Sequence, residues 1–245
     1  MEEQLWITKL LNHAFAGPVD ALLNALPAPF HPANPQAPIT NAVAMEVLVV
    51  CILIAFFLLV RSSLSVEKPG SVQHIAEMLD EFISNQSEEI IGHGGRQFAP
   101  FLSALFIFIL VANLIGLIPG FESPTGSIQI TVGLALLALI YYSLLGLREK
   151  GPGYIKHFLG PVWWMAWLLF PLEIISHLAR IMSLSVRLYA NIFAGDMVTM
   201  TFFTMVPIGL PVIFLLLHVA VSFLQAYIFV LLTTIYLQGA VSHEH

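Results

Sequence analysis

The feature that most constrains this chain is a series of apolar segments, each long enough to cross a lipid bilayer. A helix needs ~20 residues to span the hydrocarbon, and four stretches of mostly apolar residues approach or exceed that length. A fifth stretch is longer but is interrupted by polar residues. The predicted spans are residues 42–60, 98–118, 128–147, 161–206 and 211–237.

The composition agrees with lipid as the main solvent. Hydrophobic residues make up 58% of the 245 positions and charged residues only 10%, with a mean hydropathy of +0.87. Soluble domains carry about 25% charged residues. Cys51 is the single cysteine and lies in the first span, which excludes an intramolecular disulfide and argues against a cysteine metal site. We therefore expect an all-α, polytopic membrane protein with about five transmembrane helices, no metal or cofactor and no nucleic-acid partner.

Outside the spans, the pattern divides the chain into two parts. Residues 1–40 are predicted to be an outer-side segment, with an interrupted apolar pattern followed by a proline-rich linker. Residues 41–245 are predicted to form a single membrane domain. Within it, apolar residues at helical spacing over about 71–92, opposite acidic residues, predict an amphipathic helix on the cytoplasmic surface.

The basic residues predict an orientation. Six of the nine Lys and Arg residues fall in the connections after the first and third spans. Such connections face the cytoplasm by the positive-inside rule. With five crossings, the N-terminus is expected outside and the C-terminus inside. The sequence shows neither a secretory signal nor an organellar transit peptide, which favours a bacterial cell (inner) membrane.

Polar residues run along the fourth predicted span. From Pro171 to Val206 the run would be about 54 Å long as a helix, whereas the hydrocarbon is about 30 Å thick, so the helix must tilt steeply. Such a tilt needs a protein surface to follow, which is a first sign of a partner. The polar residues are Glu173, His177, Arg180, Arg187 and Asn191 on one face, with Asp196 further along.

Charged groups at this depth are costly and need an explanation. Each costs ~2.5–3.5 kcal/mol on insertion scales, so they normally face protein or water and mark a pathway. The alternative is that they only pair with each other between helices. Arg187, which follows Ser183 by four residues, stays protonated at any accessible pH. It therefore cannot relay protons, but it can attract a carboxylate and repel a proton, as a gate between two pathways would.

The last predicted span carries a matching polar face, with His218, Ser222 and Gln225 at spacings of 4 and 3. The last two spans run in opposite directions. If Gln225 faces Arg187, Asp196 lies about 13 Å outward of that level and His218 about 10 Å. An acid beside an imidazole is a plausible site of proton uptake from the outer side. The alternative is a static hydrogen bond that stabilises the helix pair.

The inward end of the fourth span has its own titratable pair. Glu173 and His177 lie 14 and 10 residues from Arg187 on the cytoplasmic side. They are candidates for a second pathway, although a location among lipid headgroups explains them almost as well. One polar arm thus leads outward, another leads inward, and a permanent cation stands between them. Such an arrangement requires a proton carrier supplied by a partner.

Three parts of the sequence resemble subunit a of F-type ATP synthases. They are the segment from Ser183 to Asp196, the His218-x6-Gln225 spacing, and the ending Gln225-Ala-Tyr-Ile-Phe…Ile-Tyr-Leu237. The likeness covers roughly residues 40 to 245. It implies a fold whose last two helices are long, tilted and packed against a rotating ring of c subunits. It also implies a b-subunit peripheral stalk and the remainder of the complex as partners.

On this resemblance, Arg187 takes the role of the essential stator arginine. Residues matching the proton path are Asn191, Gln225, Asp196 and His218, and Glu173 matches an acidic position near the cytoplasmic half-channel. His177 is a candidate beside Glu173. Weaker candidates are Arg180, Ser183, Asn113 and Ser222. Relatives can carry an acid at the position of Gly116, so the lining of the outer channel is expected to differ here.

The leading hypothesis is a proton-channel stator that performs no bond chemistry itself. No Walker-type glycine loop is present, so nucleotide chemistry is expected in partner subunits. A self-contained secondary transporter would instead show broken helices and related halves, which the sequence lacks. An inert anchor is disfavoured by the cost of its buried charges. The proton is the default coupling ion, and Na⁺ remains open because the ion-binding carboxylate belongs to the ring.

Overall fold

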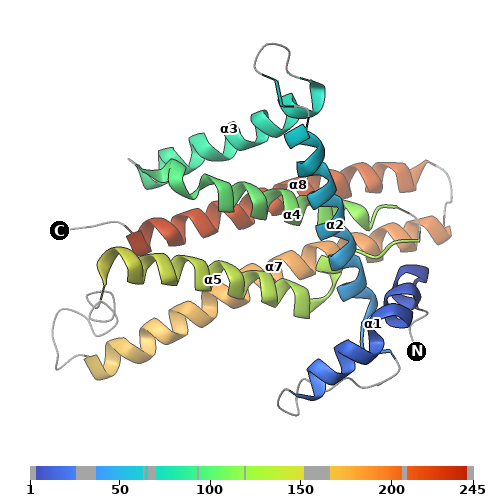
Figure 1. Ribbon diagram of the computed structural model, residues 1–245, viewed down its shortest axis with the longest axis horizontal. Helices are drawn as coiled ribbons and strands as arrows, with labels where there is room; N and C mark the ends of the chain where they lie inside the picture. Colours follow the sequence, from blue (N-terminus) through green and yellow to red (C-terminus); the bar gives the residue numbers. More distant parts are fainter. Residues whose placement is uncertain are drawn as a thin grey trace.

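The described part of the chain folds as helices. The computed structural model describes residues 4–25, 37–62, 64–65, 70–92, 94–118, 120–151, 166–205 and 209–241. Within these ranges all regular elements are α-helices or short 3-10 turns (Figure 1). They are α1 (Trp6–Asn24), α2 (Asn41–Ser62), α3 (Ser71–Ile91), η2 (Gly95–Phe98), α4 (Ala99–Ile115), η3 (Pro124–Gly126), α5 (Ile128–Lys150), α7 (Ala166–Met205) and α8 (Leu210–Val241).

Five of the described helices are long and apolar enough to cross a membrane. They cover Asn41–Ser62, Gly95–Ile115, Ile128–Glu149, Leu169–Met205 and Val212–Val241. The predicted fold class, an all-α polytopic membrane protein, is thereby confirmed. Residues 161–165 of the fourth predicted span lie outside the described residues. The division into an outer segment and one membrane domain stays a prediction.

Helix α7 is the longest described element. Its 40 residues correspond to about 60 Å at 1.5 Å per residue, twice the thickness of the hydrocarbon. It is described from Ala166 onward, within the predicted span of 161–206, so Pro171 lies inside the helix. Because proline has no amide hydrogen, Pro171 leaves the carbonyl of Trp167, four residues earlier, without its usual helical hydrogen bond.

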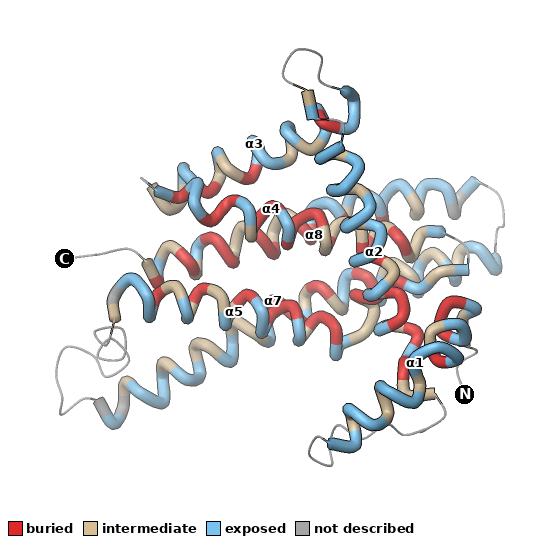
Figure 2. The backbone as a smooth tube through the Cα atoms, viewed as in Figure 1, coloured by how far each residue is buried: buried red, intermediate tan, exposed pale blue. Residues whose placement is uncertain are grey.

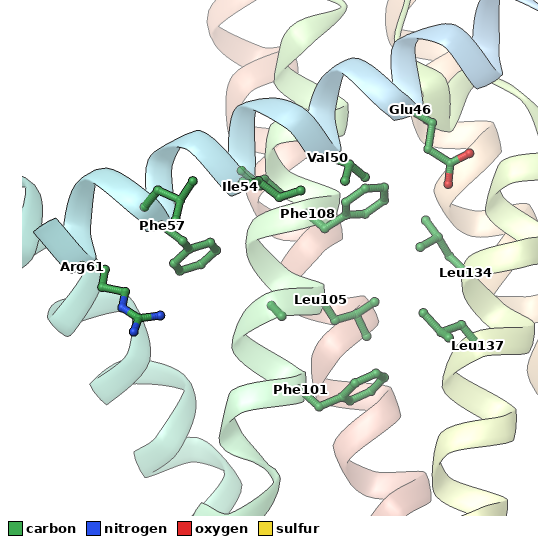
Figure 3. A pocket seen from close by; sticks show the side chains of 13 residues that line it. Glu46, Val50, Ile54, Phe57, Arg61, Phe101, Leu105, Phe108, Leu134 and Leu137 are labelled. Atoms are coloured by element: carbon green, nitrogen blue, oxygen red, sulfur yellow. The ribbon is translucent and has the colours of Figure 1, made fainter. Parts of the chain in front are cut away.

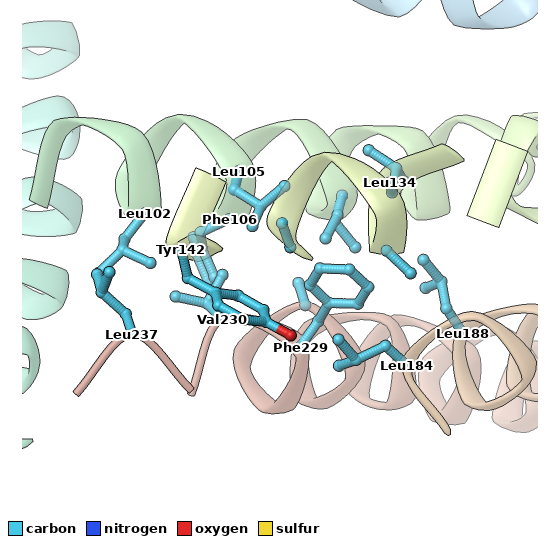
Figure 4. Close-up of a cluster of buried hydrophobic side chains, with 14 of the residues drawn as sticks. Leu102, Leu105, Phe106, Leu134, Tyr142, Leu184, Leu188, Phe229, Val230 and Leu237 are labelled. Carbon is cyan, nitrogen blue, oxygen red and sulfur yellow. The ribbon is translucent and has the colours of Figure 1, made fainter. Parts of the chain in front are cut away.

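The core is formed where α4, α5, α7 and α8 meet. Helix α8 packs against α4, α5 and α7, and α7 packs against α5. Figure 4 shows the centre of this contact, where Phe106, Tyr142 and Phe229 lie among aliphatic side chains from all four helices. Each of these three rings is nearly or fully buried. The core holds α7 and α8 side by side and antiparallel, which fixes the depth of their polar residues relative to each other (Figure 1).

Burial is distributed unevenly over the spans. In the most apolar window of the α4 span 61% of residues are buried, but in that of α7 only 11% are buried. Figure 2 shows the same contrast, with α4 largely red and much of α7 pale blue. Helix α7 therefore presents a long face that the described chain does not cover.

Helix α3 packs against η2, α4 and α8. Its Asp80 accepts a hydrogen bond from Ser103 at 3.0 Å, and Gln86 donates one to Tyr227. It ends at Ile91 and is followed by Gly92, whose φ of 87° favours glycine. The helix predicted over about 71–92 is thus present, whereas its position at the cytoplasmic surface stays a prediction.

A groove separates α2 from the rest of the bundle. It has a volume of about 610 Å³ and is lined by apolar side chains of α2, α4 and α5. Figure 3 shows Phe57, Phe101 and Phe108 along it, with Glu46 and Arg61 at the two ends. Helix α2 therefore makes its main contact with the bundle near its first turns, where Ala44, Met45 and Val49 are buried.

Candidate functional site

The predicted acid–imidazole pair is brought together across α7 and α8. His218 Nδ1 lies 3.8 Å from Asp196 Oδ1. This distance is too long for a hydrogen bond, and neither ring nitrogen of His218 has a hydrogen-bond partner in the described residues. The static hydrogen bond considered as the alternative is therefore absent. The pair thus consists of a buried imidazole, only 4% exposed, that faces a carboxylate at ion-pair distance.

The pair lines a cavity, here called the Asp196 cavity. Its volume is about 850 Å³, and its walls come from the start of α2, the loop between α4 and α5, and the facing parts of α7 and α8. The Asp196 side chain is 46% exposed, whereas His218 lies behind it with 3% of its side chain exposed. Water that fills the cavity would therefore reach Asp196 first.

Gly195 explains why the imidazole fits against α7. A Cβ at this position would lie 3.0 Å from both Cε1 and Nδ1 of His218. Such contacts are tighter than ordinary van der Waals distances. The glycine beside Asp196 thus lets the His218 ring approach the α7 backbone.

Gln225 and Asn191 form the next polar contact between the two helices. Asn191 Nδ2 donates a hydrogen bond to Gln225 Oε1 at 2.7 Å, and Gln225 is buried. The partner of Gln225 is thus Asn191, one helical turn along α7 from Arg187, rather than Arg187 itself. The contact places Gln225 about 6 Å, or one turn, further along α7 than the prediction assumed, and Asp196 and His218 still meet.

Arg187 has no acidic partner in the described part of the chain. Its Nη2 donates to Ser183 Oγ at 3.2 Å, one turn earlier on α7, and no carboxylate lies within ion-pair distance. Arg187 and Asp196 are nine residues apart, about two and a half turns, so they project from opposite flanks of the helix. Between these flanks Leu184, Leu188 and Ile192 are buried in the core. The guanidinium is left available to a group outside this chain.

A second titratable cluster lies toward the start of α7. His177 Nε2 is 3.5 Å from Glu173 Oε1, and its Nδ1 is 3.0 Å from the hydroxyl of Tyr142 on α5. One turn on, the Arg180 guanidinium stacks over the ring of Tyr236 at 4.9 Å. Tyr142 therefore joins the predicted pair, and Tyr236 joins the neighbouring Arg180; neither tyrosine was predicted as part of the site.

The weaker candidates Asn113 and Ser222 also meet. Asn113 Nδ2 donates to the backbone carbonyl of Ser222 at 3.3 Å, and Thr125 Oγ1 donates to Asn113 Oδ1 at 2.6 Å. Thr125 exchanges a hydrogen bond with Ser123 at 2.7 Å. The Ser222 hydroxyl is buried without a partner in the described residues. Ser123 and Thr125 were not predicted as part of the site, because they lie in a segment between two spans that is rich in Pro and Gly and is typical of a turn.

Gly116 has no room for a side chain. An added Cβ would lie 2.8 Å from Ser123 Cβ and 2.9 Å from Ser123 N, closer than real contacts allow. The helical φ of −66° at this position would itself accept any residue. The loop after α4 therefore packs so closely against the end of that helix that an acidic side chain would not fit at position 116.

We expect Gly116→Ala to destabilise the folded chain by about 1–3 kcal/mol, as overpacking does. The measurement is the fraction of chain that stays folded in detergent over a temperature series. Gly133→Ala is the matched control, because a Cβ at Gly133 meets nothing within 4 Å. A Gly116→Ala chain as heat-resistant as the control would contradict the close packing described here.

The three regions lie in order along α7. The Glu173 cluster is 14 residues, or about 21 Å, from Arg187, and Asp196 is about 13 Å away in the other direction. Each end offers groups that titrate, whereas the centre offers a cation that does not. The row therefore has its titratable groups at the two ends, on either side of a permanent cation.

Comparisons with known proteins agree on one family. The family model described as ATP synthase A chain matches residues 43–238. Over 246 residues, the chain is 54% identical to ATP synthase subunit a of Koribacter versatilis (strain Ellin345), with 100% of both chains covered. It is 47% identical over 213 residues to ATP synthase subunit a of Solibacter usitatus (strain Ellin6076), covering 86% of this chain and 91% of that relative.

Proposed function

Because this chain belongs to the ATP synthase A chain family, we propose that it supplies two offset aqueous half-channels separated by a mid-membrane arginine, Arg187. As a family member it is a multi-pass, proton-translocating subunit of the membrane sector and works with the rest of the ATP synthase complex. The proposal concerns how it moves protons. It also holds that the chain itself is non-catalytic and that nucleotide chemistry belongs to other subunits.

The observation that carries the proposal is the isolation of Arg187. A buried or half-buried cation normally has a counter-charge, since leaving it unpaired in lipid is costly. Within the described chain, Arg187 finds only the Ser183 hydroxyl. The uncovered face of α7 beside it fits a partner helix that brings a carboxylate. We assign that partner as the rotating ring of c subunits, with the b-subunit stalk holding the chain against it.

The two clusters on either side of Arg187 then act as the ends of two routes. A proton from the outer side reaches Asp196 and His218 and moves to a ring carboxylate. That carboxylate, now neutral, can leave Arg187 and enter the lipid. After nearly a full turn the proton is released toward Glu173 and His177 on the cytoplasmic side.

The membrane potential drives the cycle. Each proton yields about 2.3 kcal/mol per 100 mV, so several protons are needed per ATP. In this scheme the cell (inner) membrane holds the chain with its N-terminus outside and its C-terminus in the cytoplasm. A transporter acting alone would need its own carboxylate opposite Arg187, and the described residues contain none within ion-pair distance.

Cysteine cross-linking tests the assigned partner. In a Cys51→Ser background, Ala190→Cys places a thiol on the exposed face of α7 near Arg187. We expect it to form a disulfide with a cysteine introduced beside the c-subunit carboxylate. Ile140→Cys is the matched control, since Ile140 is exposed on α5. Cross-linking from Ile140 but not from Ala190 would place the ring on another face and contradict the proposal.

A further inference from the structure

Three polar residues follow one face of α8 inward from the Asp196 cavity. His218, Ser222 and Gln225 are separated by four and three residues, so their side chains lie on neighbouring turns. All three are buried, with 4%, 0% and 2% of their surfaces exposed. Along the helix axis Ser222 lies about 6 Å inward of His218 and about 4.5 Å outward of Gln225. It is therefore the polar side chain that stands between the imidazole and the amide.

The Ser222 hydroxyl differs from the other buried hydroxyls of α8. Thr233 and Thr234 each donate to a backbone carbonyl four residues earlier, at 2.8 and 2.9 Å, as hydroxyls inside helices often do. Ser222 Oγ has no hydrogen-bond partner in the described part of the chain, and neither has either ring nitrogen of His218. Buried polar atoms are nearly always hydrogen-bonded to protein or to water. Helix α8 therefore holds two buried polar groups, one turn apart, that need a partner from elsewhere.

The surroundings of Ser222 are polar and lead back to the Asp196 cavity. Asn113 of α4 donates a hydrogen bond to the backbone carbonyl of Ser222 at 3.3 Å. The Oδ1 atom of Asn113 accepts from Thr125, which shares a hydrogen bond with Ser123. Ser123 lines the Asp196 cavity, and Asn113 and Thr125 are fully buried. Helix α4 and the loop after it therefore give this part of α8 a polar neighbourhood, which is the kind of site that holds buried water.

The spacing of the groups on α8 matches single water molecules. Cβ atoms one turn apart on a helix face lie about 5–6 Å from each other. Two successive hydrogen bonds between oxygen atoms, each about 2.7–2.8 Å long, cover the same distance. One water molecule therefore fits between His218 and Ser222, and another fits between Ser222 and Gln225. The second lies beside the Asn191–Gln225 contact, one turn along α7 from Arg187.

We propose that Ser222 links two bound water molecules into a proton route from His218 to Gln225. This inference rests on the proposed function, in which Asp196 and His218 receive protons from the outer side. The His218 imidazolium releases a proton from Nε2 to the first water, which gives one to Ser222 Oγ. The hydroxyl gives its own hydrogen to the second water, which delivers a proton to the ring carboxylate. Each water and the hydroxyl receives one proton and gives one, and His218 returns to its neutral form.

The competing interpretation is that Ser222 is only a small side chain that lets the helices pack. Ser222→Ala separates the two interpretations, because alanine keeps a small side chain and removes only the hydroxyl. That hydroxyl has no partner within the described residues, so its deletion breaks no hydrogen bond of the described chain. The variant should therefore resist heat at least as well as the unchanged chain, whereas the proposed route would lose its middle member.

The experiment uses the whole complex in proteoliposomes, with ATP synthesis driven by a fixed proton gradient in H₂O and in D₂O. Rates are normalised to assembled complex, and heat resistance is measured on the same preparations. We expect Ser222→Ala to slow synthesis about tenfold, the effect of removing one buried hydrogen-bonding partner from a transfer step. The ratio of the rates in H₂O and D₂O should rise, because proton passage becomes limiting.

Thr234→Val is the matched control for this variant. It also removes a buried hydroxyl from α8, but one that is already bonded within the helix, and valine has nearly the shape of threonine. Both its rate and its isotope ratio should stay those of the unchanged complex.

An unchanged rate in Ser222→Ala would overturn the assignment, because protons would then pass without the hydroxyl. A slower rate with an unchanged isotope ratio, or with reduced heat resistance, would also overturn it, since the hydroxyl would then act through packing. His218→Ala, run in parallel, tests the proposed function by itself. If His218→Ala slows synthesis and Ser222→Ala does not, only the role of Ser222 fails. If neither variant slows synthesis, the proposed outer route fails as well.

Discussion

Changing Arg187 to Ala should stop ATP-driven proton pumping while leaving the complex assembled. The guanidinium has no acidic partner in the described chain, so its removal breaks no internal ion pair. It would remove the charge that attracts the ring carboxylate. At ~4 Å and an effective dielectric near 20, such an attraction is worth about 4 kcal/mol. Coupled pumping should therefore fall by two to three orders of magnitude, as measured by quenching of a pH-sensitive dye in vesicles.

The same substitution should open a passive leak. With the cation gone, the two ends of the α7 pathway can exchange protons without rotation of the ring. The leak is measured as the decay of an imposed proton gradient without ATP. Arg187→Lys keeps the charge but loses the planar fork, so it should leak little and pump weakly. Arg148→Ala, on an exposed residue of α5, is the control. Normal pumping by Arg187→Ala would refute the proposed gate.

Asp196→Asn and His218→Ala should each slow proton-driven ATP synthesis by about 10²-fold. This factor is the lower end of the range expected when a positioned acid–base group is removed. The two groups lie 3.8 Å apart and share the Asp196 cavity. If they act in one transfer, the double variant should be no slower than the worse single variant. The measurement is the rate per assembled complex under a fixed proton gradient.

Thr199→Ala is the matched control for this pair, because Thr199 lines the same cavity without a group that titrates near neutral pH. Its rate should stay close to that of the unchanged complex. Losses that multiply in the double variant would mean that Asp196 and His218 act independently. Losses confined to the yield of assembled complex would mean that the pair only supports the helix packing.

The membrane-spanning helices could be predicted from sequence because lipid permits so few structures. A backbone in hydrocarbon must bond to itself, so each apolar run of sufficient length becomes a helix. The antiparallel pairing of α7 and α8 then follows from their short connection. From that pairing, simple counting brought Asp196 to the depth of His218, and the 3.8 Å separation agrees with it.

Contacts between distant segments could not be predicted in the same way. Tyr142 meets His177 from a helix 35 residues earlier, and Asn41 meets Glu122 across 81 residues. Periodicity shows which side of a helix is apolar but not which partner covers it. The sequence shows that Gly116 stands where relatives can carry an acid. The close approach of Ser123, which leaves no room for a side chain there, could be seen only in the structure.

The continuity of α7 has a consequence for how such sequences can diverge. Glu173, Arg187 and Asp196 stand on one uninterrupted helix, so their spacing is counted in residues. Inserting one residue between Arg187 and Asp196 would shift them by about 1.5 Å and turn them by about 100° relative to each other. A substitution alters one side chain, but an insertion or deletion would rotate and shift every polar residue after it relative to those before it. This stretch of the sequence is therefore one in which length is constrained more tightly than composition.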